Sequence, residues 1–163
     1  MLCSFTEALT LPEGMVGLEV RSLAARNPCG FVFTSLAEEQ FYLSNNLPEQ
    51  LRDLFKPLNP RRLDEDLLET LCVKAQKLVL DSILLEDFVS QAYTAFSNVK
   101  LRGVFHLRRP SSARLEPASN RREMLLALKR TWAFDWGFSS VLERLDLAGS
   151  VGLDARAVYV LGI

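Results

Sequence analysis

The chain has 163 residues, of which 48% are hydrophobic and 24% are charged, and its net charge is −1. This composition is typical of a folded domain with a single core, and it excludes a disordered chain. The three cysteines, Cys3, Cys29 and Cys72, are odd in number and far apart, which argues against a disulfide framework and a zinc site. We therefore expect an intracellular, cytoplasmic protein with reduced thiols.

The N-terminal part predicts a β-hairpin followed by two helices. Met15 to Leu23 alternates apolar and polar residues with the period of a half-buried strand, and Phe31 to Phe33 fits a short returning strand. Ser35, with Glu38 three residues later, has the form of a capping box at the start of a helix. Pro48 fits the first turn of the next helix, because its backbone angle is already helical.

The longest amphipathic segment runs from Leu63 to Val99. Its apolar residues recur three and four positions apart, which predicts about eight turns of helix. Near Leu78 to Leu85 apolar residues point in nearly every direction, so we expect this part at the centre of the domain. The same run is far shorter than the roughly 20 residues needed to cross a bilayer, and no membrane span is predicted. Because Asp81 and Ser82 resemble a helix start, one bent helix and two helices fit equally well.

Two further strands and a loop are expected in the C-terminal half. Lys100 to Arg108 alternates again and predicts a strand whose outer face is basic. Arg109 to Ser119 contains two prolines and three serines and predicts a loop. Ala157 to Leu161 is apolar without alternation, which is typical of a strand covered on both faces.

Between that loop and the last strand, the sequence predicts a helix. Asn120 and Glu123 resemble a capping pair at its start, and the helix continues into an aromatic cluster that contains Trp132. Gly137 is expected to end it, before a short turn over Ser140 to Leu145.

Together these elements predict an α+β fold. We expect a single helix-rich domain over residues 1–163, with a long central helical segment. A small antiparallel sheet is expected to form from the regions of Met15, Lys100 and Ala157 and to pack against that segment.

The charges are unevenly distributed along the chain. Lys100 to Arg130 holds nine lysines and arginines against Glu116 and Glu123, a balance of +7, so the remaining residues carry −8. Such a segment can attract nucleic-acid phosphates or an acidic protein surface. It can equally pack within the molecule, near the acidic start of the long segment between Asp64 and Glu69.

Residues that would support catalysis are scarce. His106 is the single histidine, which limits acid–base chemistry and metal binding, and no glycine-flanked serine nucleophile is present. Phe105, Trp132 and Trp136 fit core positions better than platforms for nucleic-acid bases. We therefore predict no catalytic residue, no cofactor and no metal, and do not expect an enzyme.

The sequence favours a non-enzymatic protein–protein interaction module, an adaptor or a subunit of a larger intracellular complex, whose partner is another, acidic protein. The alternative is an accessory nucleic-acid-binding protein that uses the basic segment over residues 100–130. Ser111 follows two arginines in the expected loop and is a possible phosphorylation site. The residues predicted to contact the partner or phosphate are Arg102, Arg108, Arg109, Arg114, Arg121 and Arg122.

Overall fold

The computed structural model of the protein describes residues 1–162. Nine helices and five strands form within these residues, and the predicted α+β, helix-rich fold class is confirmed. The elements, in chain order, are β1 (Leu2–Cys3), α1 (Phe5–Ala8), α2 (Glu13–Val16), α3 (Val20–Ala25), β2 (Gly30–Phe33), α4 (Ser35–Ser44), α5 (Leu47–Phe55), α6 (Glu65–Asp81), α7 (Glu86–Asn98), β3 (Phe105–Arg108), β4 (Glu116–Ala118), α8 (Arg121–Phe134), α9 (Phe138–Ala148) and β5 (Val158–Gly162).

The chain divides into two compact units. The first unit, which contains the sheet, consists of Met1–Phe41, Leu84–Thr131 and the stretch from Ala155 onward. The second unit consists of Tyr42–Ile83 and Trp132–Asp154 and is helical. The expectation of a single domain over residues 1–163 stays a prediction.

The sheet of the first unit has five strands in the order β1-β2-β5-β3-β4, and every neighbouring pair is antiparallel. The antiparallel sheet was predicted, and so were β2, β3 and β5, although β3 begins later than expected. Arg109 to Ser119 is not entirely a loop, because β4 forms near its end. In the centre of the sheet, β5 pairs with β2 on one side and β3 on the other.

The predicted strand over Met15 to Leu23 is wrong, and with it the expected hairpin. This stretch forms α2 and the start of α3, separated at Gly17, which has a positive φ of 85°. Val16, Val20 and Leu23 are buried, and their spacing of four and three residues fits a helix. Val16 and Val20 alone would fit one face of a strand, but Leu23 would lie on its other face. The predicted strand would bury Leu18, but this side chain is 73% exposed.

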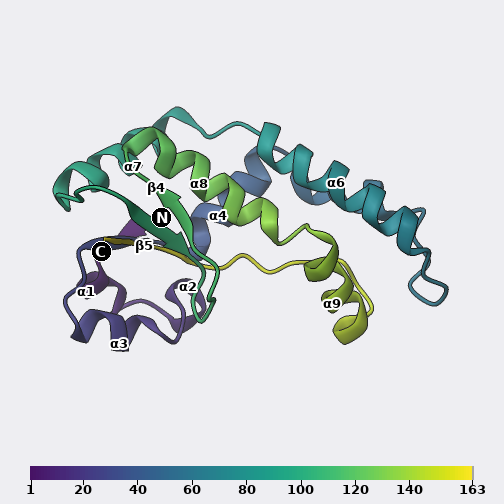
Figure 1. Cartoon of the computed structure of the whole chain (residues 1–163), viewed down its shortest axis with the longest axis horizontal. Coiled ribbons are helices and arrows are strands. Elements are labelled where there is room, and N and C mark those ends of the chain that lie inside the picture. The colour runs from purple at the N-terminus through teal and green to yellow at the C-terminus, as the bar shows by residue number, and fades with distance from the viewer. Residues whose placement is uncertain (163) are drawn as a thin grey trace. The chain divides into compact units, whose positions relative to one another are not determined.

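Helices cover the sheet of the first unit on two sides. Figure 1 shows α1, α2 and α3 on one side of the strands and α4, α7 and α8 on the other. Val32 and Tyr159 of the sheet share a buried apolar cluster with residues of the three N-terminal helices, Phe5, Ala8, Val16, Val20 and Leu23. On the opposite face, Phe88 and Phe96 of α7 pack against Phe33 and Phe105, with ring centroids 5.7 and 5.6 Å apart.

The segment from Leu63 to Val99 forms two helices, α6 and α7, so the two-helix alternative is correct. Asp64 caps the start of α6 by accepting from the amide of Leu67, and Ser82, with extended backbone, follows its last residue, Asp81. The expectation that Asp81 and Ser82 start the second helix is wrong, because they end α6 and α7 begins at Glu86. The expectation that Leu78 to Leu85 is buried on all sides is wrong. Leu80, Ile83 and Leu85 are 41%, 72% and 45% exposed, because this stretch contains the connection between the helices.

The second unit packs around α5, α6 and α9. Phe55 of α5 lies against Trp136, with ring centroids 5.9 Å apart, and the Trp136 indole donates to the Tyr42 hydroxyl at 2.8 Å. The Asn45 side chain forms two 2.9 Å hydrogen bonds with the backbone of Ile83, just after α6. The helix at Pro48 is confirmed, whereas the expected short turn over Ser140 to Leu145 is part of the longer α9.

Candidate interaction surface

The basic segment Lys100–Arg130 supplies β3, β4 and most of α8. Ion pairs within the first unit engage four of its cations, Arg108, Arg109, Arg114 and Arg130. Their carboxylate partners in these ion pairs are Glu19, Glu38 and Glu116. Four other cations, Lys100, Arg102, Arg121 and Arg122, are exposed.

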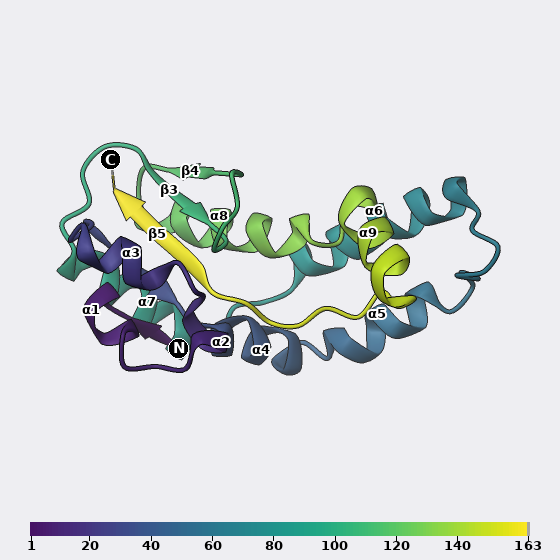
Figure 2. The same cartoon turned by 90° about the horizontal axis from the view of Figure 1, so that it is seen from below.

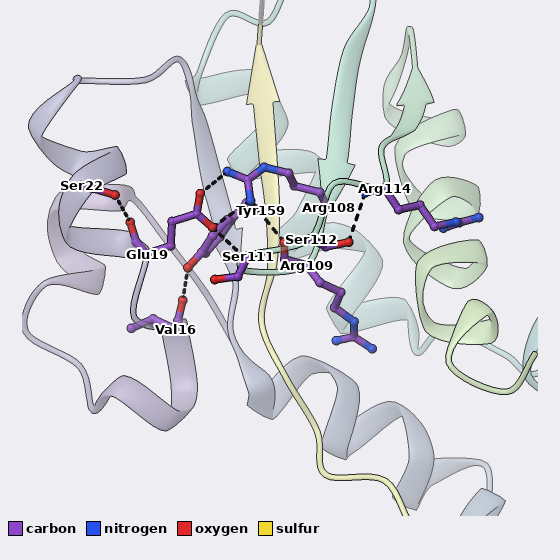
Figure 3. A network of polar contacts seen from close by, with 9 residues as sticks. All are labelled: Val16, Glu19, Ser22, Arg108, Arg109, Ser111, Ser112, Arg114 and Tyr159. Carbon is purple, nitrogen blue, oxygen red and sulfur yellow. Dashed lines mark hydrogen bonds and ion pairs between the residues drawn. The ribbon is translucent and has the colours of Figure 1, made fainter. Parts of the chain in front are cut away.

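Arg108, at the end of β3, binds Glu19 at the start of α3. Its two terminal nitrogens donate to the two Glu19 oxygens at 2.9 and 2.6 Å, and the amide of Ser111 donates to the same carboxylate at 2.7 Å (Figure 3). The hydrogen bond from Arg108 lowers the pKa of Glu19, and the same bond raises the pKa of Arg108.

Tyr159 on β5 completes this contact. The Arg108 guanidinium lies 5.6 Å from the centre of the Tyr159 ring, and the tyrosine hydroxyl donates to the Val16 carbonyl at 2.6 Å. Burial raises the pKa of Tyr159 to about 12, so the phenol remains a hydrogen-bond donor at neutral pH. These bonds fasten the α2–α3 corner to the sheet.

The next residue, Arg109, points toward the other helical layer. It forms two hydrogen bonds with Glu38 of α4, at 3.1 and 2.6 Å, and its side chain is only 6% exposed. Glu38 also accepts from the amide of Arg156 at 2.9 Å, and Arg109 donates to the Arg156 carbonyl at 2.9 Å. Glu38 is therefore a buried ion-pair partner. α4 begins at Ser35, as predicted, and the capping role of Glu38 stays a prediction.

Arg114 and Arg130 share one carboxylate. Both donate to Glu116 of β4, Arg130 at 3.0 Å, and this links α8 to the edge of the sheet. At the start of α8, Asn120 accepts from the amide of Glu123 at 2.9 Å, as the capping pattern predicted.

Of the six predicted contact residues, three therefore remain on open surface. Arg102 lies in the connection between α7 and β3, and Arg121 and Arg122 begin α8. The Arg121 guanidinium stacks 4.4 Å from the centre of the Tyr93 ring. The placement of Arg108, Arg109 and Arg114 in ion pairs does not favour contacts with a partner.

Ser111 is exposed and has a positive φ of 59°. The two arginines before it, which a basophilic kinase would read, are both held by carboxylates of the chain. Recognition by such a kinase would require this turn to be released first, and modification of Ser111 stays a prediction.

The aromatic residues considered for base stacking lie in the core. Phe105, Trp132 and Trp136 are 1%, 1% and 4% exposed, which agrees with the packing interpretation. His106 is partly buried on the outer face of β3, opposite Pro117 of β4.

Within residues 1–162, one part of a sheet face, at β3 and β4, has no helix over it. Phe105 and Leu107 of β3 are buried, and the residues that alternate with them belong to the opposite face of the sheet. Val104 and Leu115, just before β3 and β4, continue this opposite face. We call Val104, His106, Leu115 and Pro117 the open face. Val104 and Leu115 are 49% and 50% exposed. Figure 2, which views the sheet from this side, shows α1, α2 and α3 beside β3 and β4 and α8 behind them.

Sequence reasoning missed the open face, although a signal was present. The alternation of Lys100 to Arg108 predicts a basic outward face, yet Val104 occupies one of its outward positions. An apolar residue out of phase with the buried set is the kind of position that marks a contact surface.

No family model matches the chain, and a search of curated proteins finds no relative. Among the described residues, no helix combines the length and apolar character that crossing a bilayer needs. Within residues 1–162, no three His, Cys, Asp or Glu side chains are grouped so that they could hold a metal ion.

Proposed function

We propose that the protein is a non-enzymatic interaction module, an adaptor or subunit of a larger complex, that binds another protein through the open face. The observation that carries this proposal is the exposure of Val104 and Leu115, which directly precede β3 and β4, beside the helices α1, α2 and α3 (Figure 2). Apolar residues grouped on a surface and bordered by charged groups are typical of protein-binding sites. Lys100 and Arg102 provide such a border next to Val104.

Site-specific photocrosslinking tests this proposal. A benzophenone amino acid at Leu115 is introduced in cells that express the protein, and the same group at Gln91, an exposed position on α7, serves as the matched control. We expect a discrete protein adduct from Leu115 that is absent at Gln91. If both positions give the same adducts, or neither gives any, the open face does not bind a protein partner.

Nucleic-acid binding is the second candidate, and the exposed cations Lys100, Arg102, Arg121 and Arg122 support it. It is the weaker one, because half of the six predicted phosphate contacts are already engaged by carboxylates. Titration with RNA and DNA at two salt concentrations discriminates the candidates, since phosphate contacts make the affinity fall steeply with salt. No binding at low salt would eliminate nucleic acid.

A further inference from the structure

We infer that the open face receives an amphipathic α-helix with acidic flanks from the partner protein. This inference rests on the proposed function and specifies the partner. It depends on three features of the first unit, which are the uncovered face of β3 and β4, the edge strand and the exposed charges.

The first feature is the layer arrangement. The opposite side of these two strands is covered by helices, with Phe96 of α7 against Phe105 and Arg130 of α8 bound to Glu116. α1, α2 and α3 cover the other end of the same face, around Val32 and Tyr159. A helix over β3 and β4 would complete the layer that the three N-terminal helices begin.

The dimensions of the two strands agree with a single helix. Strands lie about 4.8 Å apart and a helix is roughly 10 Å wide, so one helix covers two strands. The four residues of β3 extend about 13 Å, which corresponds to roughly nine helical residues, or between two and three turns.

The second feature is the edge of the sheet. β4 is an edge strand, and its middle residue is Pro117, which has no amide to donate. Addition of a partner strand to this edge would lose a hydrogen bond at its centre. The face of β3 and β4 is therefore the better docking site than their edge.

The third feature is charge. Lys100 and Arg102 are exposed at the Val104 end of the face. Glu19 and Glu116 are bound by arginines, and Glu123 accepts hydrogen bonds from Ser119 just after β4. Among these groups the two exposed cations outnumber the one exposed carboxylate. The border of the open face thus carries an excess of positive charge, which is complementary to acidic residues flanking the apolar stripe of a helix.

Two designed helical peptides of about 15 residues provide the test. They share one apolar stripe, and they carry either glutamates or lysines on both flanks. We expect the glutamate peptide to bind and to shift the backbone NMR signals of residues on and beside the open face. The lysine peptide should bind about tenfold more weakly or not at all, since it places like charges together.

Two variants locate the binding. L115E should weaken binding of the glutamate peptide by about tenfold, whereas L126E, at a residue of α8 that is 46% exposed, should leave it unchanged. Equal affinity for both peptides, equal effects of the two variants, or signal shifts centred on other residues would overturn the inference. A Leu115 adduct that contains two copies of this chain would also overturn it.

Competition separates this inference from the proposed function. If the Leu115 photoadduct forms and the glutamate peptide suppresses it, both stand. If the adduct forms and the peptide at saturating concentration leaves it unchanged, the partner does not use an acidic helix, while the proposed protein-binding function survives.

Discussion

The buried ion pair between Glu38 and Arg109 offers a stringent test of the fold. We consider E38L, R109M and the double variant E38L/R109M. Each single substitution removes one charge of the pair and leaves the other in the interior, whereas the double substitution removes both charges together. The exposed pair Lys77–Asp81, whose side chains are 74% and 63% exposed, provides the matched control.

The expected magnitudes follow from the burial of the two side chains, which are 6% and 1% exposed. Removal of one partner from a buried ion pair costs about 3–5 kcal/mol, because the remaining charge is desolvated without compensation. Replacement of both partners by apolar residues is often close to neutral. Here the amide and carbonyl of Arg156 also lose their bonds to the pair, so we expect the double variant to be destabilised by about 1–3 kcal/mol.

Urea unfolding followed by circular dichroism measures these effects as changes in the free energy of unfolding. The double-mutant cycle should give a coupling energy of about 3 kcal/mol or more for Glu38 and Arg109. For Lys77 and Asp81 the same cycle should give less than about 0.5 kcal/mol. Single variants that each lose less than about 1 kcal/mol, or a coupling equal to that of the exposed pair, would refute the burial argument.

Three further predictions concern the first unit. The bond with Arg108 holds the pKa of Glu19 below 4.5, so the pair stabilises the protein above that pH. This contribution disappears as the pH falls through the lowered pKa. In acid unfolding, the free energies of unfolding of wild type and E19Q should therefore converge below pH 4.5. G30A should prevent folding, since its Cβ would lie 1.8 Å from a backbone oxygen of β5, whereas G14A, with open space around it, should retain wild-type circular dichroism. Cys29 is exposed, and the other two thiols have pKa values raised to about 11. A thiol reagent should therefore modify one cysteine rapidly in the native protein, and C29S should abolish this fast phase.

Local sequence patterns identified the elements whose signals are also local. Pro48 starts a helix through its own backbone angle, and Asn120 caps α8 through the amide of Glu123 three residues away. The strand β5 was recognisable because both of its faces are buried, which requires an unbroken apolar run.

Features that depend on distant residues could not be predicted in this way. Glu38 and Arg109 are separated by 71 positions, and nothing near Glu38 distinguishes a buried ion-pair partner from a helix cap. The stretch from Met15 to Leu23 failed for another reason. Val16 and Val20 fit both periods, whereas Leu23 fits only the helix. Gly17 separates α2 from α3 at a position where an added Cβ would lie 2.6 Å from Pro110 and 2.7 Å from the Tyr159 hydroxyl.

The two consecutive arginines of the basic segment stabilise the fold and are not free to form a binding site. Neighbouring residues of a strand point to opposite faces, so Arg108 and Arg109 each reach a different helical layer, one through Glu19 and the other through Glu38. These two glutamates reduce the balance of the segment from +7 to +5 before any partner is considered. Consecutive charged residues at the end of a strand can therefore stabilise a fold. Val104, an apolar residue at an outward position whose neighbours on that face are polar, better indicates where another protein would bind.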